Sequence, residues 1–320
     1  MVPFWLQALV LGVVQGLTEF VPVSSSAHLV LVPYLLGWQQ PALAFDVALH
    51  MGTLAAVLCY FRRELWAMAV AVTRGAQEAE GRLYRQLALL LVLASVPVAI
   101  VGALLERRIA AVFQAPGVTA ALLFVTAAIL AIGEKIRDRR VGRTLVTVNA
   151  DGDGTLVGGA AKSGAAKAIT ATRLRRLPVG WDDHDPAGAT LAELGVRQAV
   201  TVGLMQVVAL LPGVSRSGST ITGGIASGLT REAATRFSFL LSIPALIGAG
   251  MLSLADLTQP GPFGATDLAI GVLAAFVAGY LAIRWLVALV AHARLTGFAW
   301  YCAAAGAIGV LGYLMLGPPP

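Results

Sequence analysis

The chain has 320 residues, of which 58% are hydrophobic and only 12% are charged. Soluble domains carry about 25% charged residues, so this composition excludes an ordinary soluble protein and indicates an integral membrane protein. The net charge of +6 does not indicate nucleic-acid binding, because the basic residues gather in a few segments between apolar runs.

The first segment, 1–38, is apolar but is interrupted by the polar stretch "TEFVPVSSSAH" at 18–28. One moderately apolar arm leads into a Pro- and Ser-rich turn. The second arm, 24–37, has only 14 residues and is too short to cross a bilayer. The pattern predicts a re-entrant helical hairpin, which a membrane tolerates only where protein or water covers the turn.

Six apolar runs follow that reach the length of about 20 residues needed for a membrane-spanning helix. Basic residues are absent from 1–60 and gather in 61–85 and 134–194, and loops rich in Lys and Arg stay in the cytoplasm. This charge pattern orients every span and places the base of the first hairpin outside. The six runs are 43–61, 86–105, 114–133, 234–254, 267–291 and 296–316.

Residues 141–192 differ from the rest of the chain. They are rich in Gly, Ala and charge and have no apolar period, which predicts a flexible cytoplasmic loop. Part of the segment, 149–160, half-matches a calcium-binding loop. Ala160 stands where such a loop needs a bidentate Glu, so we favour the loop without calcium.

A second hairpin is predicted at 195–230, and it is related to the first. Shifting the chain by 191 residues places "GVVQ" on "GLMQ" and "VSSSAHL" on "VSRSGST". The charge pattern puts the bases of the two hairpins on opposite sides of the membrane. We therefore predict an all-α integral membrane protein: one domain, 1–320, with inverted repeats at 1–133 and 195–320 and a site where the two turns meet.

Polar side chains at this depth are costly and indicate function. In the second turn, Arg216 offers a planar set of donors suited to phosphate, and its neighbours offer hydroxyl and backbone N–H groups. The short arm that follows begins a helix, whose N-terminus favours an anion. We therefore expect Arg216 to bind phosphate together with Ser24, Ser26, Ser215, Ser217, Gly218 and Thr220.

Three residues indicate chemistry beyond phosphate binding. Ser25 and His28 are three residues apart and share a helix face, as a nucleophile and its base do. In the alternative role, His28 exchanges a proton with the leaving group. Glu19, with Gln15 four residues earlier on the same face, is the expected site for a divalent metal ion.

Structural interpretations stay open for the same residues. A serine-rich turn can simply cap a helix, and Arg216 can pair with Glu19 without any role in catalysis. For Asp46 and His50, four residues apart in 43–61, we favour a hydrogen bond along the helix over a role in the site.

At these residues the sequence resembles the undecaprenyl-diphosphate phosphatases, also called bacitracin-resistance proteins. The family carries (E/Q)GLTEF-P-SS-x-G-H near its start and PG-x-SRSG-x-T in its second half. Here the motifs read "QGLTEFVPVSSSAH" and "PGVSRSGST", and the resemblance covers nearly the whole chain apart from 141–192. It implies that Glu19, Ser25, His28 and Arg216 act in catalysis.

The resemblance implies a multi-pass enzyme of the bacterial plasma membrane with its site at the outer face. It would hydrolyse undecaprenyl diphosphate to undecaprenyl phosphate and inorganic phosphate, recycling the lipid carrier of cell-wall synthesis, with Mg²⁺ or Ca²⁺ as cofactor. The expected partners are this substrate and membrane lipids; a homodimer is left open, and no nucleic acid is expected. The alternative is a prenyl-phosphate transporter or flippase, because inverted repeats are usual in secondary transporters.

Overall fold

The computed structural model describes residues 2–75, 78–113, 115–150, 188–252, 262–290 and 293–318. Within these ranges the chain is α-helical, apart from the short 3-10 helix η2 at Leu191–Glu193 and one isolated bridge between Ala189 and Leu229. The expected all-α architecture is confirmed. The helices are α1 Phe4–Phe20, α2 Ser25–Leu36, α3 Leu43–Tyr60, α4 Arg62–Thr73, α5 Ala79–Phe113, α6 Pro116–Ala150, α8 Val196–Val208, α9 Arg216–Ser227, α10 Arg231–Leu252, α11 Ala265–Val290 and α12 Thr296–Leu316.

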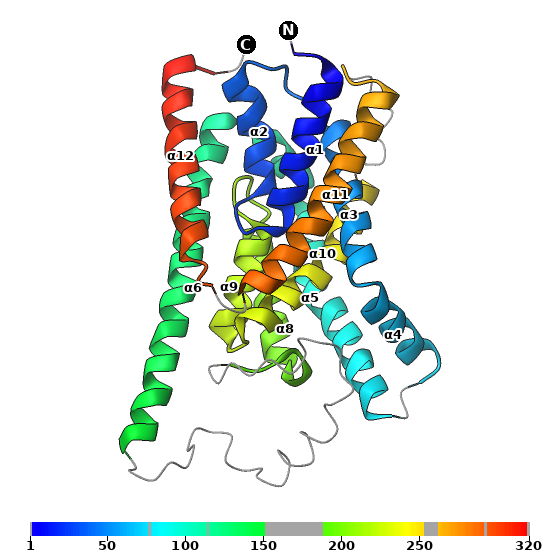
Figure 1. Cartoon of the computed structure of the whole chain (residues 1–320), viewed down its shortest axis with the longest axis vertical. Helices are drawn as coiled ribbons and strands as arrows, with labels where there is room; N and C mark the ends of the chain where they lie inside the picture. Colours follow the sequence, from blue (N-terminus) through cyan, green and yellow to red (C-terminus); the bar gives the residue numbers. More distant parts are fainter. Residues whose placement is uncertain are drawn as a thin grey trace.

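Six helices in the described part of the chain are long and apolar enough to cross a membrane, which confirms the six predicted spans. They belong to α3, α5, α6, α10, α11 and α12 (Figure 1). The remaining apolar helices α1, α2 and α8 have 17 residues or fewer. Short paired helices at the predicted hairpin positions are therefore part of the fold.

The two helix hairpins, α1–α2 and α8–α9, meet inside the bundle. Figure 1 shows α1 starting at the end where both chain termini lie, and α8 starting toward the opposite end. The backbone N–H of Gly213 donates to Ser26 Oγ (3.3 Å), and Ser217 Oγ donates to the carbonyl of Val21 (3.2 Å), so the two turns touch. In the described residues each hairpin is followed by three long helices, while re-entry into the bilayer and an inverted topology stay predictions.

Helix α1 packs closely on α11 through small residues. A Cβ atom added at Gly12 would lie 2.3 Å from the carbonyl oxygen of Gly271, and one at Gly16 would lie 2.6 Å from that of Ala275. Gly12 and Gly16 form a G-x-x-x-G pattern, which allows two helix backbones to approach. Because Gln15 and Glu19 follow on the same helix, this packing fixes where their side chains lie.

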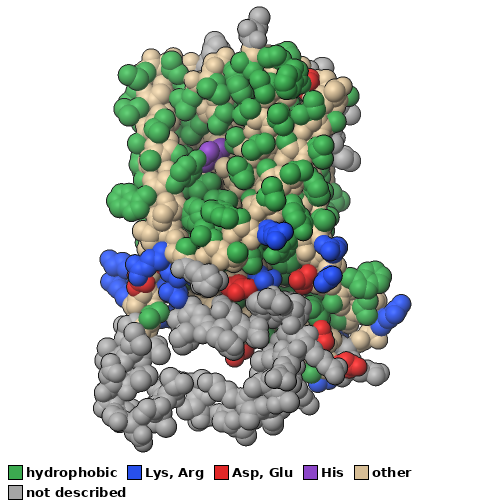
Figure 2. Space-filling model, in the orientation of Figure 1, with side chains coloured by type: hydrophobic (Ala, Val, Ile, Leu, Met, Phe, Trp, Pro, Cys, Tyr) green, Lys and Arg blue, Asp and Glu red, His purple; other side chains and the backbone are tan. Residues whose placement is uncertain are grey.

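Charged side chains gather toward one end of the molecule, below a broad hydrophobic surface (Figure 2). Two details at this end differ from the sequence-based expectation. The segment 61–85, expected only as a basic loop, contains α4 and the start of α5. Helix α6 runs to Ala150, past the expected loop start at 141, because the preceding Glu, Lys and Arg residues favour helix.

The predicted C-terminal boundary of this loop, residue 192, also needs correction. Ala189 donates its backbone N–H to Gly228 and accepts one from Thr230, and η2 follows directly. These backbone hydrogen bonds hold the chain against the end of α9, so 188–192 is not a free loop. Residues 151–187, which include most of the calcium-loop pattern, lie outside the described residues.

Candidate active site

The first hairpin places a carboxylate beside a serine. Gln15 and Glu19 lie one helical turn apart on the buried face of α1, and Gln15 Nε2 donates to Glu19 Oε2 (3.1 Å). Ser24 has φ +72°, the only positive φ among the described non-glycine residues, and it caps α2 by accepting from Ala27 N (3.4 Å). This sharp turn directs Ser25 back toward α1, and Ser25 Oγ donates to Glu19 Oε2 (2.6 Å).

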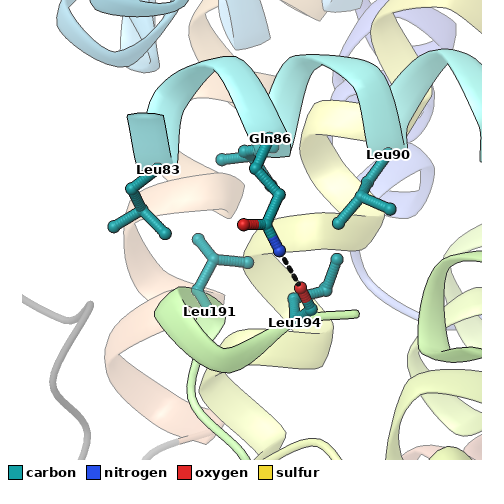
Figure 3. A pocket seen from close by; sticks show the side chains of 6 residues that line it. Leu83, Gln86, Leu90, Leu191 and Leu194 are labelled. Atoms are coloured by element: carbon teal, nitrogen blue, oxygen red, sulfur yellow. Dashed lines mark hydrogen bonds between the residues drawn. The ribbon is translucent and has the colours of Figure 1, made fainter. Parts of the chain in front are cut away.

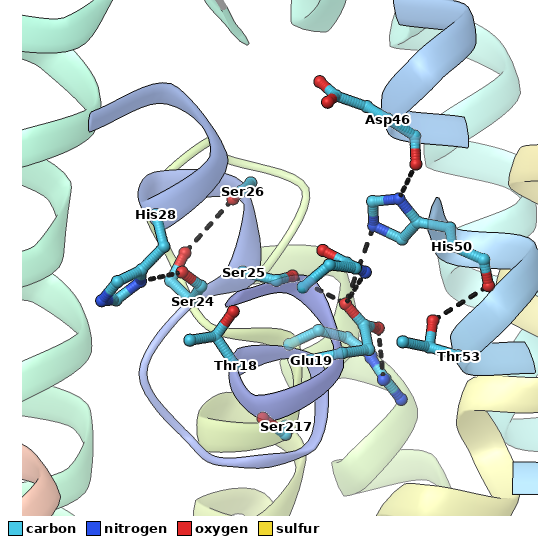
Figure 4. A network of polar contacts seen from close by, with 12 residues as sticks. Thr18, Glu19, Ser24, Ser25, Ser26, His28, Asp46, His50, Thr53 and Ser217 are labelled. Atoms are coloured by element: carbon cyan, nitrogen blue, oxygen red, sulfur yellow. Dashed lines mark hydrogen bonds and ion pairs between the residues drawn. The ribbon is translucent and has the colours of Figure 1, made fainter. Parts of the chain in front are cut away.

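The second hairpin delivers an arginine to the same carboxylate. Arg216 is the first residue of α9, and its Nη2 donates to Glu19 Oε1 (2.8 Å) while Nη1 donates to the carbonyl of Ser238 (3.3 Å). Both Glu19 and Arg216 are largely buried. The structure therefore brings together three of the four predicted catalytic residues, Glu19, Ser25 and Arg216. Figure 4 shows Ser25 beside Glu19.

The predicted phosphate-binding residues of the second turn are engaged in holding that turn. Ser215 caps α9 by accepting from Gly218 N (3.0 Å), and Ser217 contacts both Ser215 and the first hairpin. Thr220 turns toward α10 and contacts Ser238 Oγ (2.6 Å). All four are buried. In the first turn, Ser24 and Ser26 share a hydroxyl contact of 3.2 Å.

The hydrogen bonds of His28 go to groups other than Ser25, so the expected nucleophile–base pair needs correction. Its Nδ1 lies 2.7 Å from the backbone carbonyl of Ser24, and its Nε2 lies 2.8 Å from the hydroxyl of Tyr301 in α12. Figure 4 shows the ring on the other side of the serine turn from Glu19. The backbone hydrogen bond to Ser24 holds it there. The group that accepts the hydrogen bond of Ser25 is Glu19.

A second histidine, His50, lies at the carboxylate, which sequence reasoning did not favour. Its Nε2 is 3.7 Å from Glu19 Oε2, and its Nδ1 is 2.7 Å from the carbonyl of Asp46 (Figure 4). The hydrogen bond along the helix is therefore present, but it leaves Nε2 directed at the site. The signal in the sequence was an imidazole on the face of an apolar helix, which we interpreted as structural.

The expected metal ligands fit a hard cation in part. Glu19 and Gln15 supply oxygen atoms, as Mg²⁺ and Ca²⁺ prefer, and Gln15 Oε1 is buried without a hydrogen-bond partner. No group of three His, Cys, Asp or Glu residues able to hold a metal ion occurs in the described part of the chain. A cation at Glu19 would therefore complete its shell with water and substrate oxygen atoms.

A small pocket lies between α5 and η2, away from these residues (Figure 3). Gln86 Nε2 donates there to the carbonyl of Leu194 (3.0 Å), and the remaining lining is leucine. Without an ionisable or nucleophilic side chain, this pocket is not a candidate for the chemistry described above. It is lined by Leu83, Gln86, Leu87, Leu90, Leu191 and Leu194.

The fold and the site define a multi-pass membrane protein whose two hairpins join a serine, a carboxylate and an arginine inside the bundle. The chain matches the family "Bacitracin resistance protein BacA" over residues 8–308, and it belongs to that family. A relative from Desulfosudis oleivorans is 40% identical, with 95% of this chain and 96% of the relative covered. One from Geobacter sulfurreducens is 38% identical, with 97% and 98% covered. Both relatives are named undecaprenyl-diphosphatase.

Proposed function

We propose that this chain hydrolyses undecaprenyl diphosphate to undecaprenyl phosphate and inorganic phosphate. The observation that carries the proposal is the convergence of Ser25, Glu19 and Arg216 from two hairpins far apart in the sequence. Family membership and the names of the relatives support the same activity. They give no support to the alternative of a prenyl-phosphate transporter.

The geometry assigns separate tasks to the three residues. Ser25 Oγ attacks the terminal phosphorus, and its proton passes to Glu19 Oε2, to which it is already hydrogen-bonded. The bond from that phosphorus to the bridging oxygen breaks, and undecaprenyl phosphate leaves with the electron pair. Arg216 stabilises the charge that develops on the phosphate oxygens. Water then releases inorganic phosphate from Ser25.

The divalent cation belongs to the proposal as well. When bound, Mg²⁺ or Ca²⁺ would neutralise phosphate charge, and Glu19 and Gln15 would hold it through their oxygen atoms. Purified protein should lose phosphate release in excess EDTA and regain it on addition of either cation. Full activity in EDTA would remove the metal from the proposal and leave Arg216 as the main countercharge.

We place the site at the outer face of the bacterial plasma membrane. Basic side chains gather at the end of the molecule away from the base of the first hairpin (Figure 2), and basic ends stay in the cytoplasm. A substrate that is a membrane lipid then reaches Ser25 from the outer leaflet. Every residue of the site described above belongs to one chain, so the site itself does not require a homodimer.

The test is phosphate release by purified protein in detergent, since hydrolysis needs no second compartment whereas transport does. Wild type should release phosphate from a prenyl diphosphate, and Ser25→Ala should reduce kcat by about 10²-fold or more. Ser95→Ala is the matched control, because Ser95 Oγ donates to the carbonyl of Leu91 within its own helix, α5. Equal activity of Ser25→Ala and wild type would contradict the proposed step.

A further inference from the structure

The contacts of His28 define its tautomer. The carbonyl oxygen of Ser24 can only accept a hydrogen bond, so Nδ1, 2.7 Å away, carries the proton. In the neutral imidazole Nε2 then has a free lone pair, and the Tyr301 hydroxyl, 2.8 Å away, donates to it. The two rings are nearly parallel, at 8°. Both nitrogen atoms are therefore engaged, and the ring has one defined orientation.

Tyr301 is the only partner of Nε2 among the described residues, and it comes from the last helix of the chain. Tyr301 is 47% exposed, on the outer surface of α12. The next residue, Cys302, is buried and lies 3.7 Å from the carbonyl of Pro22 in the first turn. Helix α12 thus packs against the serine turn at this height and brings a hydroxyl to His28.

His28 and Tyr301 meet on one side of the serine turn. A hydroxyl facing hydrocarbon needs a hydrogen-bond partner, and His28 supplies it. Ser25, by contrast, points to the other side of the turn, toward Glu19 and α3 (Figure 4).

We propose that Tyr301 is a positioning residue for the hydrolysis and acts by holding the His28 ring. This inference rests on the proposed function. Ser25 contacts Glu19 on one side of the serine turn, and His28 with Tyr301 lies on the other side. The Ser24 carbonyl that His28 holds belongs to the turn that directs Ser25 toward Glu19. Without Tyr301 the ring of His28 loses its orientation.

The test compares two tyrosines that join α2 and α12. Tyr34, in α2, donates its hydroxyl to the carbonyl of Gly317 beyond the end of α12, so Tyr34→Phe removes a similar hydrogen bond away from His28. In full-length protein, Tyr301→Phe should lower kcat by about tenfold or more with a smaller change in KM, because a loosened His28 ring no longer holds the Ser24 carbonyl and Ser25 then shifts from its reactive position. Tyr34→Phe should keep kcat, and both variants should melt within a few degrees of each other.

A double mutant separates positioning from packing. If Tyr301 acts through His28, Tyr301→Phe should have no further effect on kcat in a His28→Ala background. An equal loss in both backgrounds, or an equal loss in Tyr34→Phe, would overturn the inference, as would Tyr301→Phe with wild-type kcat. Wild type is measured in the same assay: if it releases no phosphate, the proposed function itself fails, which is a different outcome.

Discussion

At the scale of single residues, the Glu19–Arg216 contact decides between a structural and a catalytic interpretation of the site. A buried ion pair costs desolvation energy, so its presence alone is weak support for a structural role. Arg216 donates from Nη2 to Glu19 and from Nη1 to Ser238, and its guanidinium carries five N–H donors in all, more than these two contacts use. Lysine keeps the charge but has no planar set of donors.

We therefore predict that Arg216→Ala lowers kcat/KM by about 10²–10³-fold, the usual loss for a charge-stabilising donor. Arg216→Lys should be impaired nearly as strongly. Because Arg216→Ala also leaves the carboxylate of Glu19 buried and unpaired, at a cost of about 3–5 kcal/mol, the thermal melting temperature must be measured as well. A folded Arg216→Ala protein with more than about a third of wild-type kcat/KM, a loss under ~1 kcal/mol, would return Arg216 to a structural role.

The position of Ser25 gives a prediction about coupling. Ser25 and Glu19 share a hydrogen bond and act in one step, so the double variant Ser25→Ala with Glu19→Gln should lose little more activity than the worse single variant. Ser25 and His28 direct their hydrogen bonds to different partners, so the factors by which Ser25→Ala and His28→Ala lower kcat should come closer to multiplying. The measurement is kcat of each single variant and of both double variants. Multiplying losses for Ser25 and Glu19 would count against the proposed proton transfer.

The sequence predicts contacts between residues that are close along the chain, but not contacts between distant helices. The i,i+4 relation of Gln15 and Glu19 follows from helix geometry alone, and the structure keeps it. The direction in which Ser25 and His28 point depends on the positive φ of Ser24, which spacing does not reveal. The contacts of His50 and Tyr301 depend on how α3 and α12 pack, and no local pattern encodes that.

At the scale of elements, the turn between α8 and α9 is held by a residue of α6. Thr126, 1% exposed, donates Oγ1 to the carbonyl of Gly213 (3.0 Å) and accepts from the backbone N–H of Ser215 (2.9 Å). One hydroxyl thus joins both sides of the turn that carries Arg216. Gly213 itself has φ +93°, and an added Cβ would lie 2.4 Å from the carbonyl oxygen of Thr119.

Thr126→Val keeps the shape of the side chain but leaves two buried backbone groups without a partner, which costs about 1–3 kcal/mol each. We expect a lower melting temperature and, because Arg216 shifts with the turn, a kcat about tenfold lower. Thr126→Ser should restore both. If the valine variant keeps the melting temperature and kcat of wild type, the turn does not depend on this hydroxyl.

Sequence patterns were sufficient to predict the membrane-spanning helices. Long apolar runs and short hairpin arms are set by bilayer thickness, so all six spans were predictable. Helix α4 was missed because its 12 residues mix charged and apolar side chains without a long apolar run. The extension of α6 is supported by tertiary contacts: Arg140 donates from this helix to the carbonyls of Ile225 and Ala226 at the end of α9.

At the scale of the whole molecule, orientation in the membrane follows from charge. Charged side chains gather toward one end of the molecule (Figure 2). Arg231 forms a buried pair with Glu134, and Arg294 forms an exposed pair with Asp138. Basic residues at one end orient a membrane protein with that end in the cytoplasm. The first hairpin opens at the other end, where both termini and the link between α2 and α3 lie (Figure 1).

This orientation predicts which exposed positions an impermeant reagent reaches. Gln39, between α2 and α3, and Glu78, before α5, are both exposed and lie at opposite ends of the molecule. In a background with Cys59 and Cys302 replaced by Ala, Gln39→Cys should react with an impermeant maleimide added to intact cells, and Glu78→Cys should react only after the membrane is permeabilised. Each variant must retain phosphate release, so that labelling reports the folded protein. The reverse labelling pattern would place the base of the first hairpin in the cytoplasm. Ser25 would then face substrate arriving from the inner leaflet, and the proposed outer-face site would have to be abandoned while the hydrolytic chemistry could stand.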